Sequence, residues 1–149
     1  MDGEGTITIK RVRYARDKER LYYQPYISCA QTIRGKVAID KLQQLFGGYL
    51  YRYQEKRGDR LPTYTWAVAS RDAQKCAHDL LPYLVLKVKQ AKLLIEFYRL
   101  MTMKKKAYRL ARTEDRKRER LFLQMRKLNV KGKLRLERLN EKDPVRGMR

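Results

Sequence analysis

Polar residues alternate with apolar ones near the start of this sequence, where Thr6, Thr8 and Lys10 are separated by Ile7 and Ile9. Successive side chains of a β-strand point to opposite faces, so the polar set should share one face of a sheet. Hydroxyl, amide, ammonium and phenol groups suit base edges and phosphates. Extended to the other strand-like runs, the pattern predicts one nucleic-acid-binding face, formed by Thr6, Thr8, Lys10, Gln24, Tyr26, Ser28, Tyr49, Tyr51 and Tyr53.

A simpler interpretation of this face is an antiparallel sheet that shows its polar side to water. The 11 tyrosines of the chain favour the binding interpretation. In the last strand-like run two alternatives stay open. Either Tyr64 and Trp66 or Thr63 and Thr65 point outward.

Residues suited to metal binding or nucleophilic chemistry are scarce. Cys29 and Cys76 lie far apart, without the short Cys/His spacing of a zinc site, so two reduced thiols in the core are expected. His78, the one histidine, is expected at a helix surface.

The charge balance is strongly basic, with 37 Lys and Arg against 16 Asp and Glu and a net charge of +21. Residues 99–149 carry 19 of the basic and 6 of the acidic residues. Such an excess favours a polyanionic partner, and nucleic acid is the leading candidate. A solvated, salt-laced helix is the alternative for the C-terminal third, although phosphate contact is favoured.

Strand-like runs occur in two pairs. The runs 6–14 and 22–32 predict a hairpin whose long turn is the charged stretch between them, and the runs 49–57 and 62–70 predict a second hairpin around Gly58 and Asp59. We expect a curved four-stranded antiparallel sheet with helices on one face and the other face open and basic.

Helical periodicity separates and follows these hairpins. Residues 34–46 predict a helix that ends at Gly47 and Gly48. Ser70 is expected to cap the next helix, and a last helix is expected from about Thr113. The apolar faces are predicted to be, in order along the chain, Ala38, Leu42, Leu45 and Phe46; Ala73, Cys76, Ala77, Leu80 and Leu81; Leu84, Val88, Ala91, Ile95 and Tyr98; and Leu121, Phe122, Met125 and Leu128.

Short motifs then resemble one family in order and spacing, over roughly residues 1–100. The segment 2–5 (DGEG) precedes the first strand, Gln31 ends the second strand, 40–42 (DKL) lies in the first predicted helix, 47–49 is Gly-Gly-Tyr, and 82–91 reads PYLVLKVKQA. Together they resemble the LAGLIDADG homing endonucleases in their single-motif form. The resemblance implies an α+β fold of the type (α)ββαββα, with a DNA-binding sheet and helices on its opposite face.

The resemblance also implies a catalytic site. Glu4 matches the family's acidic metal-binding position, and Gln31 and Lys87 match its polar and basic pocket positions. A carboxylate suits Mg²⁺, with Mn²⁺ as a substitute, because both metals prefer hard oxygen ligands. The ion activates water and stabilises the leaving oxygen of a phosphodiester. A plain turn acid at Glu4 and a surface lysine at Lys87 are the structural alternatives.

The chain departs from the family at its N-terminus, because Met1 stands where the family's first helix should end. We expect that most of this dimerising helix is missing from the sequence. A mis-set start, a boundary chosen for the expressed chain and a degraded gene are the open explanations. One motif per chain implies a homodimer on a near-palindromic site, provided that the first helix is present.

These observations predict a core domain at 1–103, a basic helix within 104–132 and a basic flexible tail at 133–149. The predicted function is a site-specific, Mg²⁺-dependent DNA endonuclease of the intron or intein homing type, with double-stranded DNA as partner. The alternatives are a non-cleaving DNA- or RNA-binding relative such as an intron maturase, a truncated inactive endonuclease, or an unrelated ribosomal-type RNA-binding protein. No membrane segment or secretion signal is evident, so an intracellular location is expected, in a prokaryotic or phage cytoplasm or as an organelle-encoded protein.

Overall fold

The computed structural model describes residues 5–14, 17–54, 61–102 and 112–130. Its elements are, in chain order, β1 (Thr6–Tyr14), β2 (Asp17–Thr32), the 3-10 turn η1 (Ile33–Gly35), α1 (Lys36–Phe46), β3 (Tyr49–Tyr53), β4 (Thr63–Ala69), α2 (Ser70–Leu80), the 3-10 turn η2 (Leu81–Tyr83), α3 (Val88–Thr102) and α4 (Arg112–Leu128).

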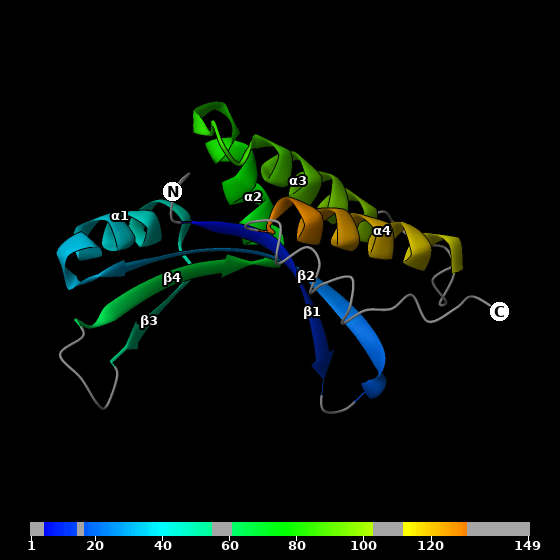
Figure 1. The fold of residues 1–149 in the computed structure, drawn as a ribbon, viewed down its shortest axis with the longest axis horizontal. Helices are drawn as coiled ribbons and strands as arrows, with labels where there is room; N and C mark the ends of the chain where they lie inside the picture. Colours follow the sequence, from blue (N-terminus) through cyan, green and yellow to red (C-terminus); the bar gives the residue numbers. More distant parts are fainter. Residues whose placement is uncertain (1–4, 15–16, 55–60, 103–111, 131–149) are drawn as a thin grey trace.

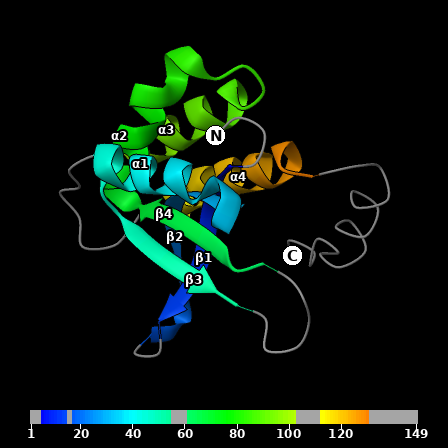
Figure 2. The ribbon, with the colours of Figure 1, turned by 90° about the vertical axis from the view of Figure 1, so that its left-hand side faces the viewer.

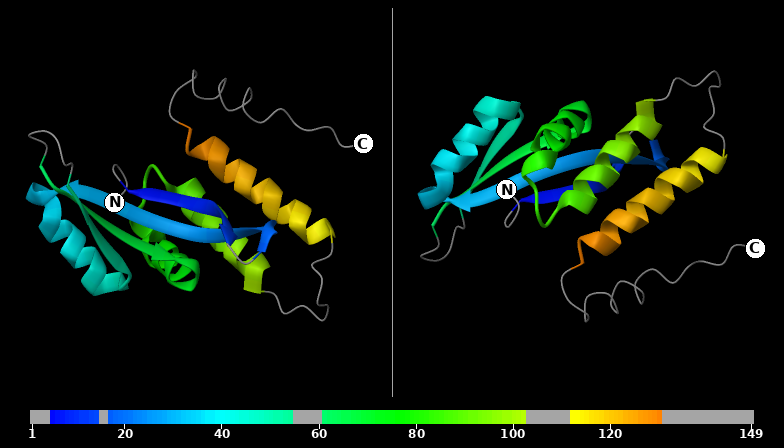
Figure 3. Two further views of the ribbon diagram at one scale, coloured as in Figure 1. Left: turned by 90° about the horizontal axis from the view of Figure 1, so that it is seen from below. Right: turned by 90° about the horizontal axis from the view of Figure 1, so that it is seen from above.

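The four strands form one antiparallel sheet in the order β1-β2-β4-β3. The sheet is arched, and all four helices lie on its convex side (Figure 1). Seen from below, the strands stand in front of the helices, so the concave face of the described sheet is open (Figure 3, left). This α+β arrangement, ββαββα with further helix, confirms the predicted fold class.

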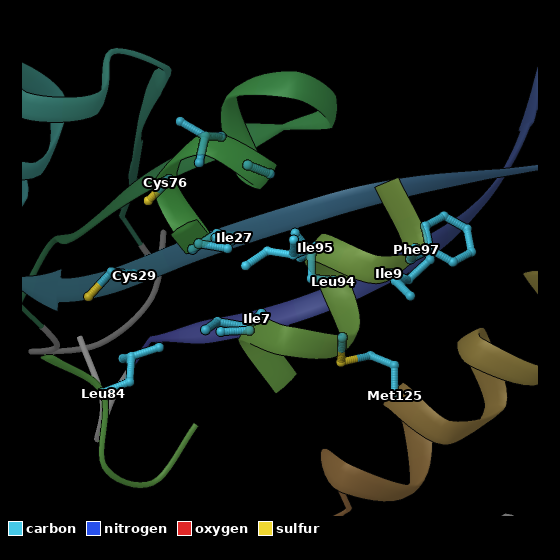
Figure 4. Packing of buried hydrophobic residues seen from close by; sticks show 14 of the residues in the cluster. Ile7, Ile9, Ile27, Cys29, Cys76, Leu84, Leu94, Ile95, Phe97 and Met125 are labelled. Atoms are coloured by element: carbon cyan, nitrogen blue, oxygen red, sulfur yellow. The ribbon is translucent and has the colours of Figure 1, made fainter. Parts of the chain in front are cut away.

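The core fills the space between the sheet and the helices. Side chains from every second residue of β1 and β2 meet the inner faces of α2, α3 and α4 (Figure 4). Among the largest fully buried side chains are Trp66, Phe97, Ile7, Ile27 and Ile39. The apolar faces predicted for α2, α3 and α4 supply many of the other core residues, although Leu128 is 37% exposed.

Pro25 marks the point at which the long strand β2 gains β4 as a second partner. It lies opposite Ile9 of β1, one residue before Tyr26, where the pairing of β2 with β4 begins. A proline has no N–H to donate, so it is tolerated in a strand only where one side lacks a hydrogen-bonding neighbour. The first half of β2 therefore pairs with β1 alone, and the sheet splays there into a two-stranded ribbon (Figure 2).

α4 is fastened to the sheet by a polar cluster around Glu119. The Glu119 carboxylate accepts hydrogen bonds from the Arg11 guanidinium and the Tyr23 hydroxyl. The Arg11 guanidinium lies 4.4 Å from the ring centre of Phe122, a cation–π contact. Just beyond the C-terminal end of the helix, the Asn129 amide donates to the Ile7 carbonyl of the edge strand β1 over 2.9 Å. The described part of the basic C-terminal third thus packs as a layer of the fold.

The predicted long turn of the first hairpin is wrong. β2 begins at Asp17, and Tyr14 pairs with Asp17, so the charged stretch from Asp17 onward belongs to the strand. Backbone pairing with β1 stabilises this stretch whatever its side chains, which is why composition alone was misleading. The tip of the second predicted hairpin, at Gly58 and Asp59, lies outside the described residues.

Two details of the predicted helices also need correction. In α1 the face turned to the sheet carries Ile39, Leu42 and Phe46, whereas Ala38 and Leu45 are exposed. The Phe46 ring packs 6.1 Å from the Trp66 ring, and Ile39, which the predicted face omitted, is fully buried. Ser70 does not cap α2 through its side chain and instead adopts a φ of +54° at the junction of β4 and α2.

Candidate nucleic-acid interface

Backbone register gathers the outward-facing residues into rows across the sheet. One row runs from Thr6 through Ser28 and Ala67 to Tyr49. The next two rows are Ala30–Thr65–Tyr51 and Thr32–Thr63–Tyr53. On the β1 side, Thr8 pairs with Tyr26 and Lys10 pairs with Gln24. All nine residues predicted for the binding face therefore share one face, opposite the helices.

The open alternative in β4 is settled by burial. Trp66 is fully buried, and its indole N–H donates to the Gly47 carbonyl over 2.7 Å. Tyr64 packs against the core, so Thr63 and Thr65 point outward. These two threonines, together with Ala30 and Thr32, complete the face, and strand alternation could identify them only after the register was known.

The tyrosines of β3 are unusually exposed for aromatic side chains. Tyr49, Tyr51 and Tyr53 are 65%, 55% and 67% exposed, and the rings of Tyr49 and Tyr51 lie 6.5 Å apart. An aromatic row on an edge strand leaves apolar area in water, which is typical of a surface that a partner covers. The phenol groups add hydrogen-bonding capacity to that surface.

The expectation that this face is basic is wrong for the part that the structure describes. Among the outward register positions of the four strands, Lys10 is the only Lys or Arg with a described side chain. Its ammonium lies 3.1 Å from the ring centre of Tyr26, where it is held in place by a cation–π contact. Strand alternation turns Arg11 and Arg52 to the helix side. The described face is therefore polar and aromatic, with a single ammonium.

Gln31 lies at the C-terminal end of β2, on the same row as Tyr64 and hence on the helix side of the sheet. It is half-buried, and Gly35 makes room for it. A Cβ added to Gly35 would lie 2.8 Å from Oε1, 2.9 Å from Cβ and 3.0 Å from Cγ of Gln31. These distances are too short for the glutamine to remain in place. Gly35 is thus a positioning residue for Gln31.

Lys87 precedes α3 in a segment that Leu84 anchors. Leu84 belongs to the core cluster that also contains Ile7 and Cys29, and Figure 4 draws it toward the N-terminal end of β1. Since β1 begins opposite Ser28, three residues before Gln31, the segment before α3 and the end of β2 approach the same end of the sheet. Lys87 is half-buried there. Glu4, the third predicted catalytic residue, lies outside the described residues.

The remaining titratable candidates behave as expected. Cys29 and Cys76 are buried, and neither forms a disulfide within the described residues. Burial, and to a smaller extent Asp79, raises the pKa of the Cys76 thiol to about 12, so it is no nucleophile at neutral pH. His78 is exposed beside Asp79 on α2. The described residues include no group of three or more His, Cys, Asp or Glu side chains able to hold a metal ion.

Solved structures share this architecture. The homing endonuclease I-CvuI, in complex with its target, superposes with a TM-score of 0.68 at 18% identity, over 95% of this chain and 87% of that one. The homing endonuclease I-TnaI matches with a TM-score of 0.65 at 19% identity, over 95% of this chain and 90% of that one. This chain has the fold of the LAGLIDADG homing endonucleases. No protein-family model and no curated protein matches the sequence.

A second kind of LAGLIDADG structure matches over only part of its length. The LAGLIDADG homing endonuclease I-GzeII, in complex with a DNA target, has a TM-score of 0.67 at 16% identity. The match covers 97% of this chain but 46% of I-GzeII. The present chain therefore corresponds in extent to about half of that endonuclease. Within the described residues, none of the helices is both long and apolar enough to span a bilayer.

Proposed function

We propose that this chain is one subunit of a site-specific DNA endonuclease of the LAGLIDADG homing type, acting as a pair on a long duplex site. The observation that carries the proposal is the open face of the sheet, where register aligns threonine, serine, glutamine and tyrosine side chains on the side opposite the helices. Solved neighbours of the same fold, I-CvuI and I-GzeII, are complexes with DNA targets, which supports DNA as the ligand.

The dimensions of the face suit half of such a site. The nine residues of β1 extend about 30 Å, at about 3.3 Å per residue, which corresponds to roughly nine base pairs. Two chains would then cover a site approaching about twenty base pairs, long enough to be rare in a genome. The match to 46% of I-GzeII supports a pair, because one chain spans about half of that endonuclease.

Base reading is assigned to the outward hydroxyl, amide and phenol groups of the face. Thr63 and Thr65 join the residues predicted from sequence, since they stand between β2 and the tyrosines of β3. With Lys10 as the one described ammonium on the face, direct hydrogen bonds and aromatic contacts have the larger share there. Phosphate contacts would then come mainly from other parts of the +21 chain.

Cleavage is assigned to Glu4, Gln31 and Lys87. The Glu4 carboxylate offers the hard oxygen donor that Mg²⁺ or Mn²⁺ needs, and such an ion, when bound, lowers the pKa of water and stabilises phosphate charge. Gln31, for which Gly35 leaves room, would orient the attacking water through its amide. Lys87 would offset the negative charge that develops on the phosphate in the transition state.

The test uses the chain preceded by the first helix that the family resemblance implies, and begins with selection of bound duplexes from a randomised library. A long selected site should be cut only with Mg²⁺ or Mn²⁺. Glu4→Gln should keep its affinity and lose cutting, and Lys87→Met should slow cutting at nearly unchanged affinity. Lys75→Met, at an exposed lysine on α2, is the matched control and should cut normally.

Two results would contradict the proposal. Full cutting by Glu4→Gln would remove the catalytic assignment. A chain that carries this helix and binds its selected site, but leaves both strands intact with either metal, would reduce the function to DNA binding.

A further inference from the structure

Lys10 carries a charge on a part of the open face that is otherwise uncharged. The other outward register positions with described side chains hold no Lys, Arg, Asp or Glu, and Lys10 forms no ion pair within the described residues. The Lys10 side chain is exposed, and its Nζ lies 3.1 Å from the ring centre of Tyr26. Its ammonium is therefore fixed in position while it stays accessible to a partner.

Lys10 lies in the two-stranded part of the sheet. It pairs with Gln24, and β2 has β4 as a second neighbour only from Tyr26 onward. The ribbon of β1 and β2 stands out from the rest of the sheet (Figure 2). The major groove of B-DNA is about 12 Å wide and admits a two-stranded β-ribbon. The ribbon therefore has a width that allows it to carry Lys10 into the groove.

The contact with Tyr26 turns the lysine away from the edge of the sheet. β1 is an edge strand, so an unrestrained lysine there could extend sideways to a phosphate on the rim of the groove. Tyr26 belongs to the interior strand β2 and lies diagonally across from Lys10, because it pairs with Thr8. Attraction to the ring therefore draws the ammonium toward the middle of the face, where base edges would lie.

The chemistry of an ammonium group selects among the four bases. It donates hydrogen bonds and accepts none. In the major groove guanine presents two neighbouring acceptors, N7 and O6. Adenine presents one acceptor beside an amino donor, thymine one acceptor beside a methyl group, and cytosine an amino donor. The N–H groups of Lys10 that point away from the Tyr26 ring therefore match guanine better than any other base.

We propose that Lys10 reads one guanine in each half of the duplex site, and that Tyr26 is the positioning residue that aims it. The ring already restricts the lysine in the free protein, so less side-chain entropy is lost when the base is bound. This restriction distinguishes Lys10 from a mobile surface lysine that neutralises phosphates without regard to sequence. The inference rests on the proposed function in placing duplex DNA on the open face, but it does not require cleavage.

The experiment measures binding, without Mg²⁺ or Mn²⁺, and uses the chain preceded by the first helix that the family resemblance implies. Duplexes are selected from a randomised library, and equilibrium affinities are then compared for four duplexes that differ at one base pair. The test variants are Lys10→Met, Lys10→Arg, Tyr26→Phe and Tyr26→Leu. Lys75→Met, at an exposed lysine on α2, is the matched control.

The wild-type chain should select one fixed guanine in each half-site and prefer it over the other bases by about tenfold. In Lys10→Met the four duplexes should bind within about twofold of one another, while the rest of the selected site is unchanged. Lys10→Arg should keep the guanine, since a guanidinium also donates to N7 and O6. Tyr26→Phe, which retains a ring, and Lys75→Met should keep the preference, and Tyr26→Leu should lose most of it.

Several results would overturn the inference. An equal loss of affinity for all four duplexes in Lys10→Met, with a salt slope shallower by about 1, would identify a phosphate contact instead. A selected site without a fixed guanine, or a guanine preference that survives Lys10→Met, would remove the base assignment. An unchanged preference in Tyr26→Leu would remove the positioning role. A chain that selects no duplex at all would instead contradict the proposed function, so the two failures are distinguishable.

Discussion

Replacing Gly48 with alanine should destabilise the strand that carries the exposed tyrosines. Gly48 has a φ of +89°, and a Cβ there would lie 2.4 Å from the Ala67 carbonyl oxygen and 2.5 Å from Cγ1 of Val68. The first contact is with backbone of the central strand β4, which cannot move without breaking its pairs with β2 and β3. The edge strand β3 must therefore shift.

Gly47 provides a matched control one residue away. Its φ is +65°, but a Cβ there would meet nothing within 4 Å. Gly47→Ala should cost only backbone strain, of order 2 kcal/mol. Gly48→Ala should add the steric conflict to a similar strain, for at least about 4 kcal/mol in total. The difference of about 2 kcal/mol between the variants isolates the close contact.

Urea unfolding followed by the fluorescence of Trp66, the single and fully buried tryptophan, measures both variants. With a slope of about 2 kcal/mol per molar urea, their midpoints should differ by about 1 M. Duplex affinity should also fall more in Gly48→Ala, because β3 places Tyr49, Tyr51 and Tyr53. Equal midpoints in the two variants would refute the steric argument.

Three further predictions concern the site and the anchoring of α4. Gly35→Ala should displace Gln31 and slow cleavage by roughly tenfold or more while duplex affinity changes little, as single-turnover cutting and equilibrium binding would measure. The pKa of Tyr23 is raised to about 12, first by burial and then by the hydrogen bond to Glu119. Since the unfolded value is about 10, Tyr23 contributes stability fully below pH 10 and loses it as the pH rises to 12, so Tyr23→Phe should flatten the fall in unfolding free energy across that window. Thr65→Val should relax base preference at one position of the selected site, by about 1–3 kcal/mol of discrimination, in a repeated selection.

Local patterns in the sequence were sufficient for most elements. Period-two alternation predicted which residues of β1 and β2 are buried, because Ile7, Ile9 and Ile27 alternate with polar residues. The two glycines that end α1 were predicted, and both adopt the positive φ that only glycine tolerates well. The motifs similar to the LAGLIDADG family predicted the fold as a whole. The roles of Glu4, Gln31 and Lys87 stay predictions, since they depend on that resemblance.

Features that depend on distant neighbours were decided by the tertiary structure. Composition suggested a turn where β2 begins, because that stretch is rich in charged residues. A charged side chain, however, says little about whether its backbone pairs with another strand. In α1, Ile39 rather than Ala38 is buried against the sheet, and Phe46 packs against Trp66, which lies 20 residues further along the chain. Which residues of β4 face outward, and hence whether Thr65 or Trp66 is available to a partner, followed from the burial of Trp66 and the register with β2 and β3.

The charge of the protein follows the same distinction between local composition and long-range packing. The net charge of +21 is a property of the sequence, and it is enough to predict a polyanionic partner. Its placement is a property of the fold. Strand alternation turns Arg11 toward α4, and helix packing collects Lys89, Lys92 and Lys127 along one groove, because residues far apart in sequence become neighbours only when the helices pack.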